Sequence, residues 1–326
     1  FYYHEAAPQK QVQRLYGLAG QPRLLPRWAF GYLQSKYGYR NETEVYALVN
    51  EFEKRAIPVS AVILDHYWFD QMGDLDWHRP DWPDPRALDV FLEKRGIKLV
   101  TITEPFFASR SRNYGAFDAL GMLAKDKSGD TVTWNKWWTL GKSPWGAVID
   151  PFSEVTRRVL GQKYVAMLQD GIDGFWTDLG EPEEVPERAL FSGMTEAQAH
   201  NYFNRAWSAL IHDAVRKAFP RRRLFNLTRS GFTGSWQYGT STWSGDVAST
   251  FAALRFHPGL GLSAGLSGLP FWGSDVGGFE SRRQKPDREL FIRWMQFGAF
   301  TPVFRAHGAN SPDRKSTRLN SSHVSE

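Results

Sequence analysis

Short apolar runs alternate along this chain with segments whose apolar residues recur every three or four positions. Residues 59–65, VSAVILD, form a nearly continuous run of β-branched and aliphatic side chains. That pattern predicts a strand buried on both faces. The preceding segment predicts a helix that begins after Asn41, with Glu44 placed to complete a capping box, and ends before Pro58. Its apolar positions follow the i, i+3, i+4, i+7 spacing: Val45, Leu48, Val49 and Phe52.

The same alternation continues to the far end of the chain. A second helix is predicted from Ser153 to about Gly171. The predicted strands cover residues 28–36, 59–65, 98–105, 174–181, 222–230, 241–246, 270–278 and 301–307. Strands separated by helices are parallel, and eight such units predict a (β/α)₈ TIM barrel. A doubly wound open sheet is the alternative, but no GxGxxG turn opens any of the helices.

Polar residues gather at the carboxyl ends of these strands. A single acid there is often the N-cap of the next helix. A whole set of them is harder to explain in that way, and in a barrel these ends meet on the face where barrel enzymes carry out their chemistry. The set is Asp65, Glu104, Asp178, Glu181, Arg229, Asp246, Asp275 and His307.

Composition narrows the class of partner. The 326 residues are 42% hydrophobic and 23% charged, with a net charge of +5 and basic residues scattered among acids, which does not favour nucleic-acid binding. No run approaches the roughly 18 apolar residues of a membrane span. The absence of cysteine excludes disulfides and thiolate metal sites but is compatible with any compartment. The 14 Trp, 12 Tyr and 23 Phe suit either a large core or the apolar faces of sugars.

A ring of carboxylates with one arginine, one histidine and several tryptophans suits two reaction classes. Metal-assisted chemistry is the weaker one, because the strand ends contain no HxH, HxxxH or DxD pair, and we predict no metal or cofactor. Glycoside hydrolysis needs two carboxyl groups on either side of the scissile bond. Asp178 closes the fourth predicted strand and Asp246 the sixth. Strands two places apart face each other across a barrel mouth, so this pair could straddle a sugar.

Six segments resemble glycoside hydrolase family 31, the retaining α-glucosidases and α-xylosidases. GFWTDLGEP is similar to the family's nucleophile motif and TWSGD to its acid/base motif. The other four are PRWAFGYLQSKYGYRNETEV, LTRSGFTGSWQYG, FWGSDVGGF and PVFRAHG, and all six occur in the family's order between about residues 22 and 310. The resemblance implies a (β/α)₈ catalytic barrel that cleaves terminal non-reducing α-linked sugars, α-glucosides first, by double displacement.

Carried over position by position, the resemblance implies a role for each site residue. Asp178 would be the nucleophile and Asp246 the general acid/base. Asp65, Arg229, Asp275 and His307 would bind the hydroxyl groups of the sugar, and Trp176 and Trp243 would form the walls of its subsite. Glu181, beyond the strand end, would support the site or contact an acceptor. The substrate would be an oligosaccharide or another α-glycoside.

The departures from the family pattern leave the substrate open. Leu179 and Gly180 stand where many family glucosidases have Met and Asn, and the DLGEP form is closer to the bacterial 4-α-glucosyltransferase branch. WNKWW, residues 134–138, could line further subsites or only pack on the barrel. Transglycosylation, α-xylosidase or α-galactosidase activity, and an inactive carbohydrate-binding homologue remain alternatives. Asp173 is predicted to be a turn residue, and Glu104 has no role in the motif match.

The resemblance also predicts the domain organisation. Residues 1–21 are expected to be the end of a preceding β-sandwich domain or its linker, residues 22–310 the barrel, and residues 311–326 a disordered tail whose native origin the sequence leaves open. Because the family normally carries β domains on both sides of the barrel, we expect a longer protein in which such domains flank this chain.

Overall fold

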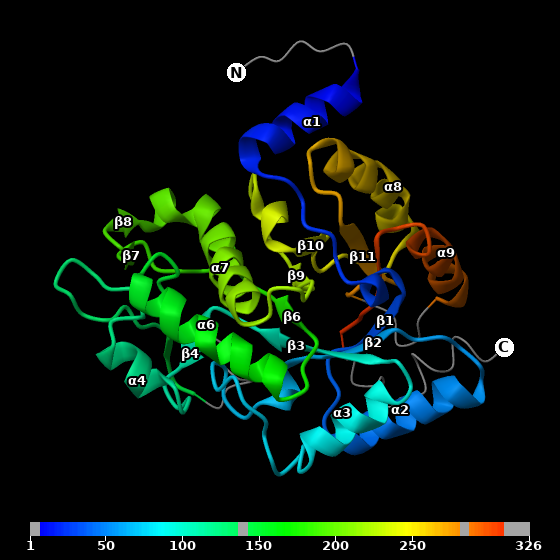
Figure 1. The fold of residues 1–326 in the computed structure, drawn as a ribbon, viewed down its shortest axis with the longest axis horizontal. Helices are drawn as coiled ribbons and strands as arrows, with labels where there is room; N and C mark the ends of the chain where they lie inside the picture. Colours follow the sequence, from blue (N-terminus) through cyan, green and yellow to red (C-terminus); the bar gives the residue numbers. More distant parts are fainter. Residues whose placement is uncertain (1–6, 136–142, 281–286, 310–326) are drawn as a thin grey trace.

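The computed structural model describes residues 7–135, 143–280 and 287–309, and its centre is a closed barrel of eight parallel strands (Figure 1). Around the barrel the strands follow the order β1-β12-β11-β10-β9-β6-β3-β2. Each of the eight predicted strands is present. The strands are β1 (Tyr32–Ser35), β2 (Ala61–Leu64), β3 (Lys98–Thr103), β6 (Gly174–Thr177), β9 (Asn226–Thr228), β10 (Thr240–Trp243), β11 (Trp272–Val276) and β12 (Val303–Ala306).

Helices surround the barrel and cover the outer faces of its strands (Figure 1). All four residues of β2 are fully buried, as expected for a strand enclosed by the barrel core on one face and helices on the other. The helices around the barrel are α2 (Glu42–Lys54), α3 (Pro85–Glu93), α6 (Glu154–Gln169), α7 (Glu196–Ala218), α8 (Phe251–Leu266) and α9 (Arg288–Gly298). The short helix α4 (Tyr114–Ala119) lies in the long connection from β3 to α6. No helix in the described ranges is both long and apolar enough to cross a membrane.

Helix α2 illustrates how local sequence sets these boundaries. The Asn41 side chain accepts a hydrogen bond from the Glu44 backbone N–H at 3.0 Å, as the capping pattern predicts. The other half of the predicted capping box is wrong, because the Glu44 carboxylate accepts from the backbone N–H of Arg40 rather than from that of Asn41 and pairs with Lys36 at 2.9 Å. The four predicted apolar positions are the buried ones: Val45, Leu48, Val49 and Phe52. Helix α6 likewise spans the second predicted helix.

Several elements were not predicted from the sequence. The first strand is shorter than predicted, because residues 27–30 form a 3-10 turn (Arg27–Phe30) after Pro26. Two small antiparallel two-stranded sheets extend the loops at the carboxyl ends of β3 and β6. They pair β4 (Phe106–Ala108) with β5 (Gly146–Val148) and β7 (Leu190–Phe191) with β8 (Met194–Thr195). Two further 3-10 turns span His66–Trp68 and Ser235–Tyr238.

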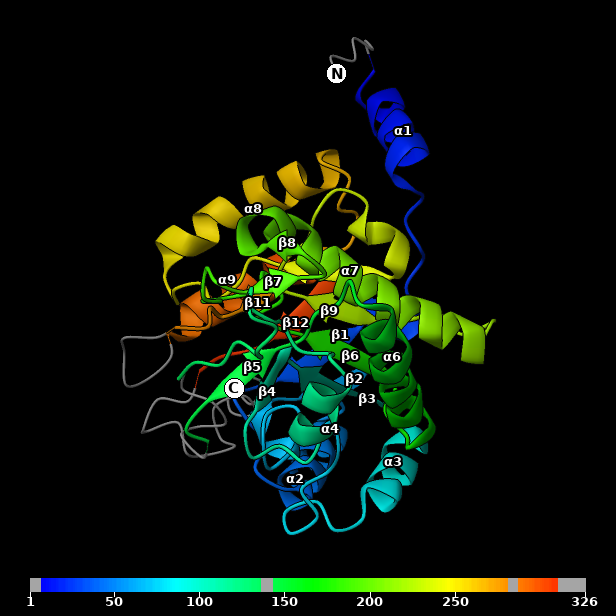
Figure 2. The ribbon, with the colours of Figure 1, turned by 90° about the vertical axis from the view of Figure 1, so that its left-hand side faces the viewer.

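Helix α1 (Pro8–Ala19) projects from the barrel and buries none of its residues (Figure 2). Its end is attached by hydrogen bonds from Trp236 Nε1 to the Gly20 carbonyl at 2.6 Å and from Gln237 Nε2 to the Ala19 carbonyl at 3.0 Å. The assignment of residues 1–21 to a preceding domain stays a prediction. The predicted tail, residues 311–326, and most of the WNKWW loop lie outside the described residues.

Asp173 lies at the end of the barrel opposite the predicted site. It stands just before β6, where its carboxylate accepts from the Leu99 backbone N–H at 3.2 Å and pairs with Lys98 at 3.1 Å. This carboxylate therefore joins the starts of β3 and β6, which agrees with its exclusion from the site.

Candidate active site

The carboxyl ends of the barrel strands surround a cavity of about 220 Å³. Six of the nine predicted site residues line it, and Glu181, Trp243 and Asp275 do not. Since β9 lies between β6 and β10, the strands that lead to Asp178 and Asp246 are two places apart, as the site prediction requires. The lining residues are Tyr37, Asp65, His66, Glu104, Trp176, Asp178, Leu179, Arg229, Asp246, Phe279 and His307.

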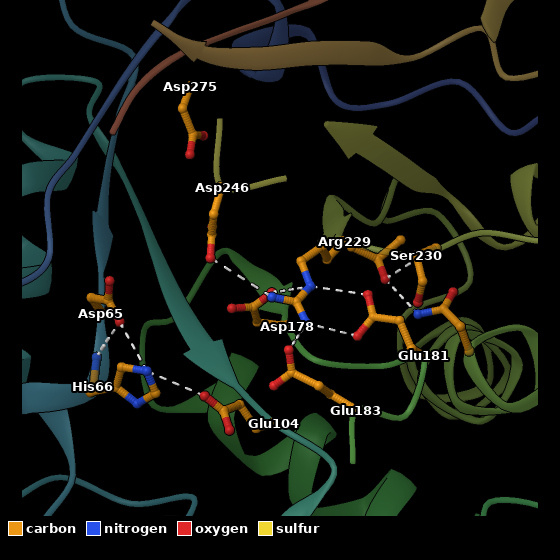
Figure 3. Close-up of polar contacts among 12 residues, drawn as sticks. Asp65, His66, Glu104, Asp178, Glu181, Glu183, Arg229, Ser230, Asp246 and Asp275 are labelled. Atoms are coloured by element: carbon orange, nitrogen blue, oxygen red, sulfur yellow. Dashed lines mark hydrogen bonds and ion pairs between the residues drawn. The ribbon is translucent and has the colours of Figure 1, made fainter. Parts of the chain in front are cut away.

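Arg229 is the centre of the charged part of the site (Figure 3). Its guanidinium makes a two-point contact with the Glu181 carboxylate, at 3.0 Å through Nε and 2.9 Å through Nη2, and Nη2 also contacts Glu183 at 3.2 Å. The same group lies 3.6 Å from Asp178 Oδ1 and 3.9 Å from Asp246 Oδ2. One cation thus faces four carboxylates, and a planar guanidinium is suited to that role because its donors point in several fixed directions.

Asp178 is held by the backbone at the end of β6. Its N–H donates to the Thr103 carbonyl at 3.0 Å, which extends the β3–β6 pairing by one residue. Leu179 follows with a φ of 54°, a left-handed conformation that is uncommon for a side chain of its kind and turns the chain away from the strand. Burial raises the pKa of Asp178 to about 7, an effect that outweighs the opposing charge of Arg229.

Asp246 is the more accessible member of the pair. Its side chain is 45% exposed, against 14% for Asp178, because it lies on the loop three residues beyond β10. Partial burial raises its pKa as well, opposed by Arg229 and then by Arg305. The two predicted catalytic carboxyl groups therefore share one arginine but differ in their contact with solvent.

The opposite wall of the cavity contains Asp65, His66, Glu104 and His307. Burial raises the pKa of Asp65 well above its ordinary value, although its Oδ1 accepts from the His66 backbone N–H at 2.7 Å. His307 Nε2 lies 3.7 Å from Asp65 Oδ2, and its Nδ1 is 2.8 Å from the Ser35 hydroxyl. Burial lowers the pKa of His307 well below its usual range, so the ring is neutral at pH 7.

Asp275 lies behind the cavity wall in a buried ion pair. Its Oδ1 accepts from Arg305 Nη2 at 2.5 Å, and both side chains are at most 1% exposed. The Arg305 guanidinium lies 4.7 Å from the centroid of the Trp176 ring and 4.8 Å from that of Trp243. A cation held between two aromatic faces fixes both rings. Trp243 therefore supports the wall that Trp176 forms.

Sequence reasoning missed Arg305 and His66 and gave no role to Glu104. Arg305 is part of the PVFRAHG motif and lies two positions before His307, so strand alternation could have placed it on the inward face. His66 directly follows Asp65, where the chain leaves β2 for the 3-10 turn. Glu104 was noted at the rim, and the structure places it in the cavity wall.

A parallel (β/α)₈ barrel with several carboxylates around an arginine at the carboxyl ends of its strands is a typical scaffold for enzymes that act on small polar substrates. The chain belongs to glycoside hydrolase family 31. The model of the "Glycosyl hydrolases family 31 TIM-barrel domain" matches residues 22–325.

Similar proteins include glycosidases of several kinds. The chain is 30% identical over 311 residues to an α-xylosidase of Saccharolobus solfataricus, covering 90% of this chain and 39% of the relative. It is 31% identical over 314 residues to "Alpha-glucosidase 2" of Bacillus thermoamyloliquefaciens, covering 93% and 39%. The chain thus spans about two fifths of the length of these two relatives.

Solved structures give the same picture. A Flavobacterium johnsoniae family 31 dextranase in complex with glucose superposes with a TM-score of 0.89 at 26% identity. The match covers 98% of this chain and 42% of the dextranase chain. A family 31 α-xylosidase from a soil metagenome in complex with xylose superposes with a TM-score of 0.87 at 30% identity. This match covers 94% of this chain and 45% of the α-xylosidase chain.

Proposed function

We propose that the protein containing this chain is a retaining α-glycosidase that removes terminal non-reducing sugars from α-glycosides, α-glucosides foremost. The observation that carries the proposal is the placement of Asp178 and Asp246 within 4.0 Å of one guanidinium at a cavity in the mouth of the barrel. Two carboxyl groups on either side of a sugar are what a double displacement needs.

The proposed reaction divides the work between these two residues. Ionised Asp178 attacks the anomeric carbon, and the bond from that carbon to the leaving oxygen breaks as Asp246 gives this oxygen its proton. Asp246 then takes a proton from water, whose oxygen attacks the same carbon and releases Asp178. The exposure of the two side chains supports this division, because Asp246 must reach both the leaving group and water, whereas Asp178 needs a fixed position.

Azide rescue of two alanine variants of the whole protein tests the assignment. With an activated aryl α-glucoside, D178A plus azide should form the β-glycosyl azide, because azide replaces the nucleophile directly. D246A plus azide should form the α-glycosyl azide through the covalent intermediate. E93Q, at the exposed end of α3, is the matched control and should retain full activity. Near-normal hydrolysis by D178A would refute the assignment of Asp178 as the nucleophile.

The sugar and the acceptor belong to the same proposal. Relatives named α-xylosidase, α-glucosidase and dextranase favour glucose or xylose in the cavity. Transfer to a sugar acceptor is the second candidate, favoured by the DLGEP form of the segment at residues 178–182. Glu181 is held by Arg229, which supports a role in fixing that arginine rather than direct contact with an acceptor. Longer products from maltotriose would indicate transfer, and glucose and maltose alone would indicate hydrolysis.

A further inference from the structure

Glu104 is a carboxylate in the cavity wall to which the proposed catalytic cycle gives no task. It directly follows β3, and the preceding Thr103 carbonyl accepts the hydrogen bond from the Asp178 N–H. Its position is therefore fixed next to that of the proposed nucleophile. The Glu104 side chain is only 1% exposed, yet it lines the cavity together with Asp65 and His66.

His66 holds Glu104 in place. Its Nε2 lies 3.2 Å from Glu104 Oε1 and 3.5 Å from Asp65 Oδ1 (Figure 3). Burial lowers the pKa of His66 to about 4, so at pH 7 the ring is neutral and carries one N–H. Both groups facing Nε2 are carboxylate oxygens, which indicates that the proton is on this nitrogen. The Tyr37 ring packs edge-on against His66 at 5.6 Å, which limits rotation of the imidazole.

A carboxylate can accept about four hydrogen bonds and donate none when it is ionised. Glu104 can thus keep its contact with His66 and still accept from a donor in the cavity. Sugar hydroxyl groups are such donors, whereas a carboxylate, phosphate or sulfate on the sugar would be repelled by the ionised Glu104 carboxylate. Charge-assisted hydrogen bonds of this kind are roughly twice as strong as neutral ones.

We propose that Glu104, positioned by His66, binds one non-anomeric hydroxyl group of the sugar in the cavity and makes the site select neutral sugars over anionic ones. This inference rests on the proposed function, since it assigns the specificity of the same cavity. It makes Glu104 a specificity-determining residue and His66 a positioning residue.

A thermodynamic cycle tests the proposal: it combines one change in the enzyme, E104Q, with the removal of single hydroxyl groups from the substrate. The kcat/KM values of the wild-type protein and of E104Q are measured on an aryl α-glucoside and on its 2-, 3-, 4- and 6-deoxy analogues. E104Q keeps the shape of the side chain and removes its charge. We expect E104Q to lose roughly 10- to 100-fold on the parent glucoside. For one deoxy analogue this loss should nearly vanish, because the hydroxyl that Glu104 binds is already missing.

An equal loss on the parent sugar and on every analogue would overturn the proposal, because it would mean that Glu104 acts only through the structure of the wall. H66Q keeps a donor and should retain most of the analogue-specific effect, while H66L should lose it. Wild-type selectivity in H66L would contradict the positioning role. An aryl α-glucuronide tests the selection against anionic sugars. The ratio of its kcat/KM to that of the glucoside should be higher for E104Q than for the wild-type protein.

Calorimetric binding of glucose and its deoxy analogues to the whole protein separates this inference from the proposed function. If E104Q weakens the binding of glucose but not that of one deoxy analogue, and there is no turnover, the glycosidase proposal would be refuted and the Glu104–sugar contact supported. Turnover without the cycle would do the reverse. Binding of none of these neutral sugars, with no turnover, would overturn both.

Discussion

Removal of the positive charge of Arg229 should shift the acidic limb of the pH–rate profile. At 3.6 Å and an effective dielectric constant of about 20, the attraction between Arg229 and Asp178 is about 5 kcal/mol. That is an upper bound on the effect, because the same cation serves three other carboxylates and water would enter the space it leaves. Since 1.36 kcal/mol corresponds to one pKa unit, we expect R229M to raise the pKa of Asp178 by one to three units.

The direction of the shift follows from the pKa of about 7 that burial already gives Asp178. A nucleophile must be ionised, and a further rise of one unit leaves roughly a tenth of it ionised at pH 7. The acidic limb of kcat/KM, which reports groups of the free enzyme, should therefore move to higher pH in R229M. E181Q removes a neighbouring negative charge that raises the pKa of Asp178, and its limb should move to lower pH.

The assay is kcat/KM against pH on an aryl α-glucoside with a good leaving group, so that proton donation by Asp246 contributes little. R229K is the matched control, because it keeps the positive charge and loses the two-point contact with Glu181. Both variants should lose affinity for the sugar, but a uniform loss does not move the limb. An R229M limb within about 0.3 pH units of the wild type would refute the electrostatic reasoning.

Three further perturbations test the fold and its buried charges. Because the pKa of Asp178 is raised in the folded state, the protein binds more protons when folded between about pH 4 and 7, and stability falls as pH rises through that window. D178N should thus have a higher Tm than the wild type at pH 8 and nearly the same Tm at pH 4, and an equal difference at both would contradict this. A Cβ on Gly273 would lie 2.2 Å from a carbonyl oxygen of β12, so G273A should fail to give a folded barrel by circular dichroism, whereas G259A, with open space in α8, should fold normally. R305M should lower the free energy of unfolding in urea by about 3–5 kcal/mol by leaving Asp275 buried and unpaired, and the R305M/D275N double variant should recover much of that loss.

The barrel was predictable because each of its strands has a local sequence pattern that can be recognised without knowledge of the rest of the chain. A run such as residues 59–65 is nearly continuous in aliphatic side chains and suits a strand covered on both faces, and residues 98–105 repeat the pattern with threonines among Leu, Val and Ile. The helices between such runs have caps and apolar stripes that can be found from spacing alone. The small two-stranded sheets were not predictable in this way. Strands β7 and β8 have two residues each, too few for a period to show, and they exist only because the surrounding loops bring them together.

The site was predictable as a set of strand ends but not as a set of contacts. Asp178 and Arg229 each directly follow a strand, which places both at the carboxyl ends of the barrel, yet spacing does not reveal that Arg229 binds Glu181 more closely than Asp178. The inward position of Asp275 follows from alternation, but its burial against Arg305 depends on how two tryptophans from other strands pack. Contacts between residues far apart in sequence set these details.

The arrangement of charge explains why the cavity can keep so many acids close together. Each buried carboxylate would be costly alone, and the described residues offer the set two arginines from different strands: Arg229 on the side of Asp178 and Asp246, and Arg305 behind Asp275. Glu104 and Asp65 have instead a neutral histidine between them. The side of the cavity near Arg229 is therefore suited to charge that changes during a reaction. On the other side Glu104 faces a neutral histidine rather than an arginine, and that division separates the proposed chemistry from the proposed choice of substrate.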